Sequence, residues 1–157
     1  MKDNPLNNDF MDFINCLNTN NVKYLLLGGY AMGFHGNPRA TNDIDFLVSK
    51  DSENIRNLEK SLIMFGTDIF KKEELYESGK IFYIGEYPNR IEILKEASGI
   101  DFEECYKRKK TFSIDGIKID VISIDDMIIN KKAANRDRDI PDINTLEKIK
   151  TNSDIKK

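Results

Sequence analysis

Residues 28–48 read GGYAMGFHGNPRATNDIDFLV, and this stretch decides the fold because it predicts a glycine turn, a short helix and a strand in close succession. The run before it, 22–27, is apolar at both parities, which predicts a central strand buried on both faces. Gly28-Gly29 then predicts a tight turn into a short helix over 30–35. Polar and apolar residues alternate over 43–48, which predicts a second strand. The stretch therefore predicts a unit of strand, glycine turn, helix and strand.

Further helices and two hairpins are predicted around this unit. The spacing of apolar residues predicts helices over about 9–17 and 55–65, and a pair of helices over about 123–150. Paired strands are predicted at 81–84 with 90–94 and at 112–114 with 117–121, the second pair joined by the hairpin signal Asp115-Gly116. We therefore expect an α+β fold, a mixed β-sheet flanked by helices with a C-terminal helical pair. Residues 1–157 are expected to form a single domain, with its core over about 22–122.

Composition and charge limit the functional classes. Of 157 residues, 39% are apolar and 32% are charged, and 24 Lys and Arg face 27 Asp and Glu, a net charge of -3. A net negative charge disfavours electrostatic binding to the phosphate backbone of extended DNA. The longest apolar run, 24–34, falls short of the roughly 18–20 residues that cross a membrane, and Cys16 and Cys105 lie outside any CxxC spacing. We therefore expect a reduced cytoplasmic protein with no membrane partner.

Asp43 and Asp45 give the sharpest chemical signal. In a strand they share one face, while Ile44, Phe46 and Val48 occupy the other. The Cα atoms of the two aspartates would lie about 6.6 Å apart, so both carboxylates can converge on two metal ions spaced roughly 3.5–4 Å apart. Carboxylate oxygens suit magnesium, with manganese as a substitute. Exposed acids also alternate with apolar residues on many half-buried strands, so the surrounding sequence must decide.

Gly28-Gly29 supplies that context. The pair ends a buried strand and starts a helix, where unpaired backbone N–H groups and the helix dipole favour a phosphate. Glycine also lets a phosphate approach the backbone closely. A phosphate cradle beside an acidic metal site is what nucleoside triphosphate chemistry needs, although a Gly-Gly pair alone is also typical of a plain turn.

In this combination the stretch resembles the nucleotidyltransferase superfamily of DNA polymerase beta, whose hallmark is Gly-Gly or Gly-Ser, a helix and then Asp-x-Asp. It is most similar to a small prokaryotic branch of that superfamily, related to abortive-infection and toxin-type nucleotidyltransferases. The matching motifs here are Gly28-Gly29, His35-Gly36 and Arg39-Ala-Thr41-Asn-Asp43-Ile-Asp45. Segments 90–94, 99–102 and 131–142 are similar to downstream blocks of the branch, so the resemblance covers about 24–146.

The resemblance implies transfer of a nucleoside monophosphate from a nucleoside triphosphate such as ATP to an acceptor, with release of pyrophosphate. It implies that Asp43 and Asp45 bind the metal and act in catalysis with a third carboxylate. By block order this is Glu92, where the branch more often has Asp, and Asp120 is the alternative. The nucleotide would be held by the following residues: Gly28, Gly29, Arg39, Thr41 and Lys131.

The acceptor stays open at this stage. Some members of the branch are toxins of toxin–antitoxin systems that modify transfer RNA or proteins, and others act on antibiotics, so the acceptor could be RNA, a protein or a small molecule. Lys131, Arg136, Asp139 and Asp142 could instead form an ion-pair network between two helices. A non-catalytic nucleotide- or partner-binding module, with an antitoxin or regulatory role, is the alternative function on the same fold.

Overall fold

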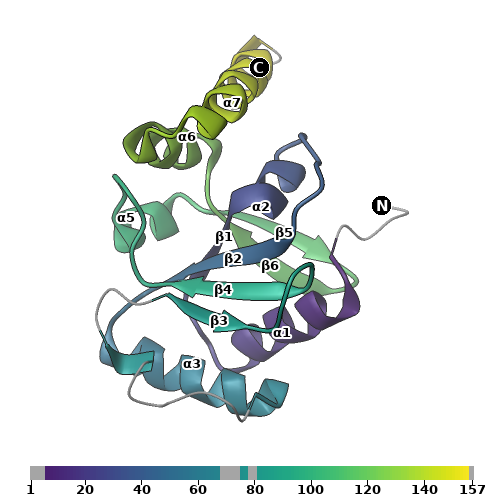
Figure 1. The fold of residues 1–157 in the computed structure, drawn as a ribbon, viewed down its shortest axis with the longest axis vertical. Helices are drawn as coiled ribbons and strands as arrows, with labels where there is room; N and C mark the ends of the chain where they lie inside the picture. Colours follow the sequence, from purple (N-terminus) through teal and green to yellow (C-terminus); the bar gives the residue numbers. More distant parts are fainter. Residues whose placement is uncertain (1–5, 68–74, 78–80, 156–157) are drawn as a thin grey trace.

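The computed structural model describes residues 6–67, 75–77 and 81–155, and within them six strands form one mixed sheet with helices packed around it (Figure 1). The strands are β1 (Tyr24–Leu27), β2 (Asp43–Val48), β3 (Phe82–Ile84), β4 (Arg90–Leu94), β5 (Lys110–Ile114) and β6 (Ile117–Val121). The helices are α1 (Asn8–Thr19), α2 (Gly28–Phe34), α3 (Ser52–Phe65), α5 (Phe102–Lys107), α6 (Ile124–Ala134) and α7 (Ile140–Ile155), with a 3-10 turn η1 (Asp137–Asp139) before α7. The expected α+β class is confirmed.

The sheet has the strand order β3-β4-β2-β1-β6-β5. β2 runs antiparallel to β1 and parallel to β4, and its register sets Asp45 opposite Leu27 on one side and Glu92 on the other. β3 with β4 and β5 with β6 are the two expected antiparallel hairpins. The segment rich in acidic residues therefore lies in the middle of the sheet rather than at an edge.

Burial fixes which face of β2 the two aspartates occupy. Ile44, Phe46 and Val48 are fully buried, and the Phe46 ring packs against Phe13 of α1 and Tyr24 of β1 with centroid distances of 5.5 and 5.6 Å. Removing such large apolar side chains from water is worth about 1.5–3 kcal/mol each, which strongly specifies the register. The alternating Asp43 and Asp45 must then point to the opposite face.

Several helices and strands, β1 and β5 among them, begin or end a few residues from their expected bounds, and two of the helix boundaries have a clear cause. α2 begins at Gly28 rather than at residue 30, because the two glycines form the first turn of the helix instead of a separate loop. α7 runs to Ile155 rather than to about 150, since neither Gly nor Pro interrupts it after Pro141. β2 and β4 have the expected bounds.

Two further observations concern the cysteines and membranes. Cys16 and Cys105 are both free and buried. Within the parts of the chain that the structure describes, no helix has the length and apolar character needed to cross a membrane.

Candidate active site

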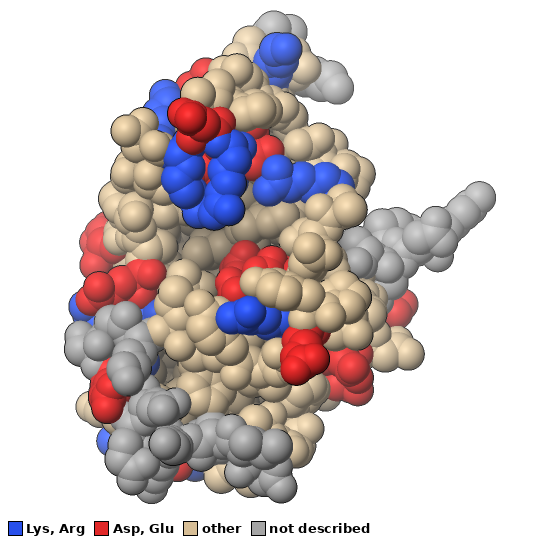
Figure 2. All heavy atoms as spheres, in the orientation of Figure 1, with Lys and Arg blue, Asp and Glu red and all other residues tan. Residues whose placement is uncertain are grey.

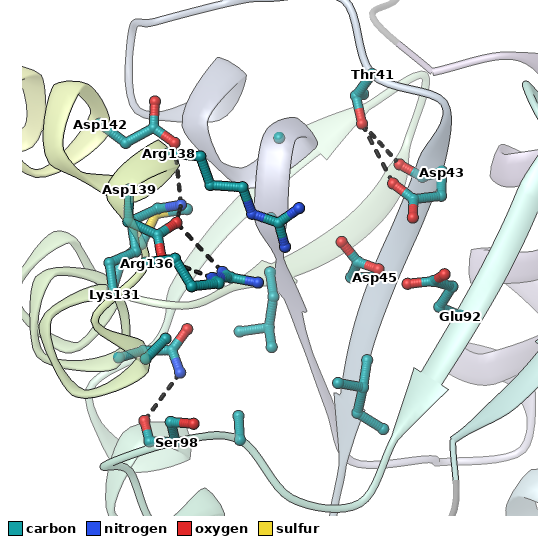
Figure 3. A pocket seen from close by; sticks show the side chains of 18 of the residues that line it. Thr41, Asp43, Asp45, Glu92, Ser98, Lys131, Arg136, Arg138, Asp139 and Asp142 are labelled. Carbon is teal, nitrogen blue, oxygen red and sulfur yellow. Dashed lines mark hydrogen bonds and ion pairs between the residues drawn. The ribbon is translucent and has the colours of Figure 1, made fainter.

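Three carboxylates meet on the exposed side of the sheet centre (Figure 3). Asp43 and Asp45 come from β2, and the parallel register of β4 sets Glu92 beside Asp45. Each of the three offers a carboxylate oxygen, and these oxygens all lie within 4.8 Å of one another. We call this cluster of Asp43, Asp45 and Glu92 the acidic floor. Its oxygen-only donor set is of the kind that magnesium and manganese prefer.

Glycine is required where α2 starts, next to this floor. Gly28 has a φ of +69°, and a Cβ atom there would lie 2.3 Å from Oδ2 of Asp45. Any larger residue would therefore be strained and would displace a floor carboxylate. At Gly29 a Cβ would lie 3.0 Å from Cβ of Thr41, whose hydroxyl donates to the backbone oxygen of Asp43 at 3.1 Å.

The floor carries more negative charge than its surroundings balance. Burial, a hydrogen bond shared with Glu92 and repulsion from Asp43 and Glu92 raise the pKa of Asp45 to about 8. Burial and the charge of Glu92 also raise the pKa of Asp43. Like charges brought together out of water disfavour ionisation unless a cation joins them. The donor set and its electrostatics therefore fit a divalent cation.

A cavity of about 830 Å³ opens in front of the floor. Figure 2 shows this side of the molecule as a hollow with Asp and Glu at its base and a group of Lys and Arg on the opposite wall. The cationic wall comes from the α2–β2 loop, α6 and η1, and Figure 3 shows side chains of this wall facing the carboxylates. We call its basic residues the cationic bank: Arg39, Lys131, Arg136 and Arg138.

Most of the cationic bank is held by ion pairs. Nη1 of Arg39 lies 2.6 and 2.8 Å from the two carboxylate oxygens of Asp142. Nζ of the buried Lys131 lies 3.1 Å from Oδ2 of Asp142 and 3.6 Å from Oδ1 of Asp139. The predicted network between helices is therefore present, and it also ties the α2–β2 loop to α7.

Arg136 and Arg138 differ in their partners. Arg136 donates from Nε and Nη2 to the two oxygens of Asp139, at 2.7 and 3.2 Å. Although burial opposes it, these bonds and the charge of Lys131 hold the pKa of Asp139 below its usual value. Arg138 makes no hydrogen bond or ion pair with any part of the chain that the structure describes, yet it lines the cavity. It is the cation most available to a ligand.

The structure brings together every residue expected at the site. Glu92 rather than Asp120 joins the aspartate pair, because Asp120 lies on β6, beyond β1, where it is buried and accepts a hydrogen bond from Thr111 at 2.8 Å. The cavity is lined by all of the following residues: Gly28, Gly29, Arg39, Thr41, Asp43, Asp45, Glu92 and Lys131.

Arg138 was not predicted from the sequence, and nothing in the spacing of Asp137-Arg138-Asp139 distinguishes it from a solvated charge. Asn130 was also missed. It lines the cavity and donates to the backbone oxygen of Ser98 at 2.9 Å, joining α6 to the loop after β4. Such residues meet only through the tertiary arrangement of α6, η1 and the sheet.

A comparison with known families shows that the protein is of the nucleotidyltransferase class. The chain belongs to a family described as nucleotidyltransferase of unknown function (DUF6036), which matches residues 9–156. This confirms the resemblance to the nucleotidyltransferase superfamily. No curated protein matches the chain.

Proposed function

We propose that this protein is a metal-dependent enzyme that transfers a nucleoside monophosphate from a nucleoside triphosphate to an acceptor. The acceptor nucleophile forms a new bond to the α-phosphorus, the bond from that phosphorus to the bridging oxygen of the β-phosphate breaks, and pyrophosphate leaves. The observation that carries this proposal is the cluster of three carboxylates in the acidic floor, which faces a cationic bank across one cavity. A triphosphate with its metal matches both charge distributions at once.

The acidic floor would hold magnesium, or manganese in its place, and two ions are expected. When bound, the metal would neutralise charge on the phosphates and lower the pKa of an acceptor hydroxyl. The raised pKa values of Asp43 and Asp45 support this fit, because a bound cation removes the repulsion that raises them. Glu92 is the carboxylate we assign to accepting the acceptor proton.

The nucleotide would lie between the floor and the bank. Leu27 precedes α2 without a side-chain hydrogen bond that caps the helix, so the first N–H groups, beginning at Gly28 and Gly29, are not used by a capping side chain. Thr41 holds the segment before β2 in place through its bond to Asp43. Arg39, Lys131, Arg136 and Arg138 would bind or position the phosphates and the leaving pyrophosphate.

The identity of both substrates is a prediction. ATP is the expected nucleotide, and the acceptor can be RNA such as transfer RNA, a protein or a small molecule. A toxin–antitoxin role is implied by the resemblance alone. A cytoplasmic location accords with two free, buried thiols.

Thermal unfolding with each of the four nucleoside triphosphates, with and without magnesium, tests the site without knowledge of the acceptor. A ligand at 100 times its Kd adds about 2.7 kcal/mol of stability, or roughly 5–10 °C for a domain of this size. We expect such a shift with magnesium for the wild type and none for Asp45→Asn.

Asp115→Asn is the matched control. It makes the same charge change in the exposed β5–β6 turn, at a residue that does not line the cavity, and asparagine tolerates the positive φ found there. A shift that survives in Asp45→Asn, or that disappears in Asp115→Asn, would contradict the proposal. Binding without any turnover over a broad acceptor screen would favour the non-catalytic binding module.

A further inference from the structure

The β3–β4 hairpin presents two exposed aromatic rings around one arginine. Tyr83 on β3 and Tyr87 in the connecting turn keep 48% and 56% of their surface exposed. The guanidinium carbon of Arg90 lies 3.6 Å from the ring centroid of Tyr83 and 4.9 Å from that of Tyr87. We call Tyr83, Tyr87 and Arg90 the stacking platform. One arginine contacting two rings fixes their positions and leaves ring surface open to solvent.

Strand register connects this platform directly to the acidic floor. Tyr83 pairs with Glu92, and Glu92 pairs with Asp45, so the three side chains lie in a row on one face of the sheet. Arg90 lies two residues before Glu92 and pairs with Asp43, and its Nε is 3.5 Å from Oε1 of Glu92. The platform thus extends the floor toward the edge of the sheet.

The platform lies on the opposite side of the floor from the cationic bank. In the sheet order β4 and then β3 follow on one side of β2. In Figure 1, α6 and α7 lie on the other side of β2 from these two strands. In an in-line displacement the nucleophile and the leaving group occupy opposite sides of the phosphorus. If pyrophosphate leaves toward Arg136 and Arg138, the acceptor must approach from the side of Tyr83 and Glu92.

The chemistry of the platform suits a flat aromatic group. Within the described residues neither tyrosine hydroxyl makes a hydrogen bond, so both can accept or donate to a ligand. Nε of Arg90 is buried and has no hydrogen-bond acceptor among these residues. The turn that carries Tyr87 is itself held, since Asn7 donates to Oδ1 of Asn89 at 2.9 Å. A rigid platform loses little conformational entropy when a ring stacks on it.

Resting on the proposed function, we propose that the stacking platform is the acceptor subsite, and that it binds the base of the terminal nucleotide of a single-stranded nucleic acid. The hydroxyl of that nucleotide would then be the nucleophile beside Glu92. Every base has a π-face that stacks on tyrosine, and Arg90 supplies one positive charge. With one cation on the platform and a net charge of -3, the chain suits a single terminal nucleotide better than a long phosphate backbone.

A tryptophan reporter tests stacking directly, because the sequence contains no Trp. In Tyr83→Trp the new indole is the only tryptophan, and its fluorescence should be quenched by a short single-stranded oligonucleotide of about eight nucleotides, added with magnesium and a nonhydrolysable triphosphate. The same oligonucleotide with an abasic terminal position keeps the phosphates and the sugar but offers no base. We expect clear quenching with the first probe and little with the second.

Fluorescence anisotropy then measures how much the Tyr83 ring contributes to oligonucleotide affinity. Tyr83→Ala should raise the Kd of the oligonucleotide about 5- to 100-fold, and Tyr83→Phe, which keeps the ring, should restore it to within about 2-fold of the wild type. Tyr76→Ala is the control, because Tyr76 is also an exposed tyrosine but donates to Glu59 of α3 and is not part of the stacking platform. RNA and DNA versions of the probe show which of the two nucleic acids supplies the terminal nucleotide.

Two outcomes would overturn the proposal. One is equal affinity for base-bearing and abasic ends; the other is a wild-type protein that binds neither the RNA nor the DNA probe. The magnesium-dependent thermal shift with nucleoside triphosphate is measured on the same variants. A preserved shift in Tyr83→Ala separates a failed acceptor subsite from a failed nucleotidyltransferase site.

Discussion

The acidic floor and the cationic bank face each other across one cavity but hold their charges in opposite ways. In the bank, Asp139 and Asp142 pair with Arg136, Lys131 and Arg39 at short distances. In the floor, carboxylates face one another and repel, and the charge of Lys131 offsets only part of the repulsion that raises the pKa of Asp45. The pKa of Asp139 is lowered, whereas the pKa of Asp45 is raised.

This difference separates charges that build the cavity from charges that await a ligand. Paired charges such as those of Asp139 and Asp142 can be explained by the folding of α6, η1 and α7 alone. A cluster of like charges at the centre of a sheet lowers stability, so its presence needs another explanation. Arg138 is also a charge that awaits a ligand, because it has no partner among the described residues although it lies in the bank.

The largest expected effect is on the floor. Asp45→Asn should reduce nucleotide transfer by at least about 10³-fold, because it removes a carboxylate that holds the metal charge at the transferring phosphate. In metal-free protein at pH 9 the same change should raise the melting temperature, since it removes repulsion within the floor. Transfer assays and thermal unfolding on one preparation measure both. A loss of activity accompanied by a loss of metal-free stability would mean that Asp45 serves the fold.

The third carboxylate can be tested with a matched pair of variants. Glu92→Gln should weaken magnesium binding and reduce transfer by about 10²-fold or more, because Glu92 completes the floor. Asp120→Asn should lower stability through its bond to Thr111 but leave magnesium affinity unchanged. Calorimetric titration with magnesium decides between them. Unchanged affinity in Glu92→Gln would move the assignment to Asp120.

Removing an ion pair from the cationic bank should lower the stability of the protein. Asp142→Asn removes the charge that pairs with both Arg39 and the buried Lys131, which should lower the free energy of unfolding by about 3 kcal/mol. Glu147→Gln is the control, because it breaks only the exposed pair with Lys132 and should cost about 0–1 kcal/mol. Denaturant unfolding compares the two, and equal small losses would show that the network is not structural.

The pH dependence of the metal-free protein follows from the raised pKa of Asp45. Between the unfolded pKa of 3.8 and the folded pKa of about 8, the folded state holds a proton that the unfolded state has released. Stability should therefore fall as pH rises from about 4 to 8 and then level off. Allowing for partial solvent screening, we expect a change of about 1–2 kcal/mol that magnesium suppresses. A stability that rises over this range in the wild type and in Asp45→Asn alike would contradict this electrostatic account.

The smallest effect separates the two arginines of the bank. Arg138→Ala should weaken triphosphate binding about 5- to 10-fold without changing stability, because Arg138 has no partner to lose among the described residues. Arg136→Ala should weaken binding and also lower stability, since the buried Asp139 would lose its two hydrogen bonds. Triphosphate binding and unfolding are measured on both variants. Equal losses of stability in the two would contradict the view that the ion-paired arginine supports the fold and the unpaired one serves the ligand.

The sequence predicts the floor better than the bank for a physical reason. The alternation in Asp43–Val48 and Arg90–Leu94 fixes both strands and the face of each acid, because period-two burial is a local property. The choice between Glu92 and Asp120 depends on strand order, which places β4 beside β2 and β6 beyond β1. No local pattern carries that order, so the sequence alone left the choice open.

Other features depend on contacts between distant segments. The tie between Arg39 and Asp142 spans 103 positions of the chain, and the availability of Arg138 is visible only when η1 is set against the sheet. The start of α2 at Gly28 was missed because no capping side chain marks it. The steric need for glycine there is set by Asp45, which reaches the helix start from the neighbouring strand.

A crystal structure with manganese and a nonhydrolysable triphosphate would test the central claim most directly, because the anomalous signal of manganese locates each ion. The account predicts ions bound by Asp43, Asp45 and Glu92, with the terminal phosphates directed toward Arg136 and Arg138. Ions absent from these three carboxylates, or a nucleotide bound outside the cavity, would contradict it.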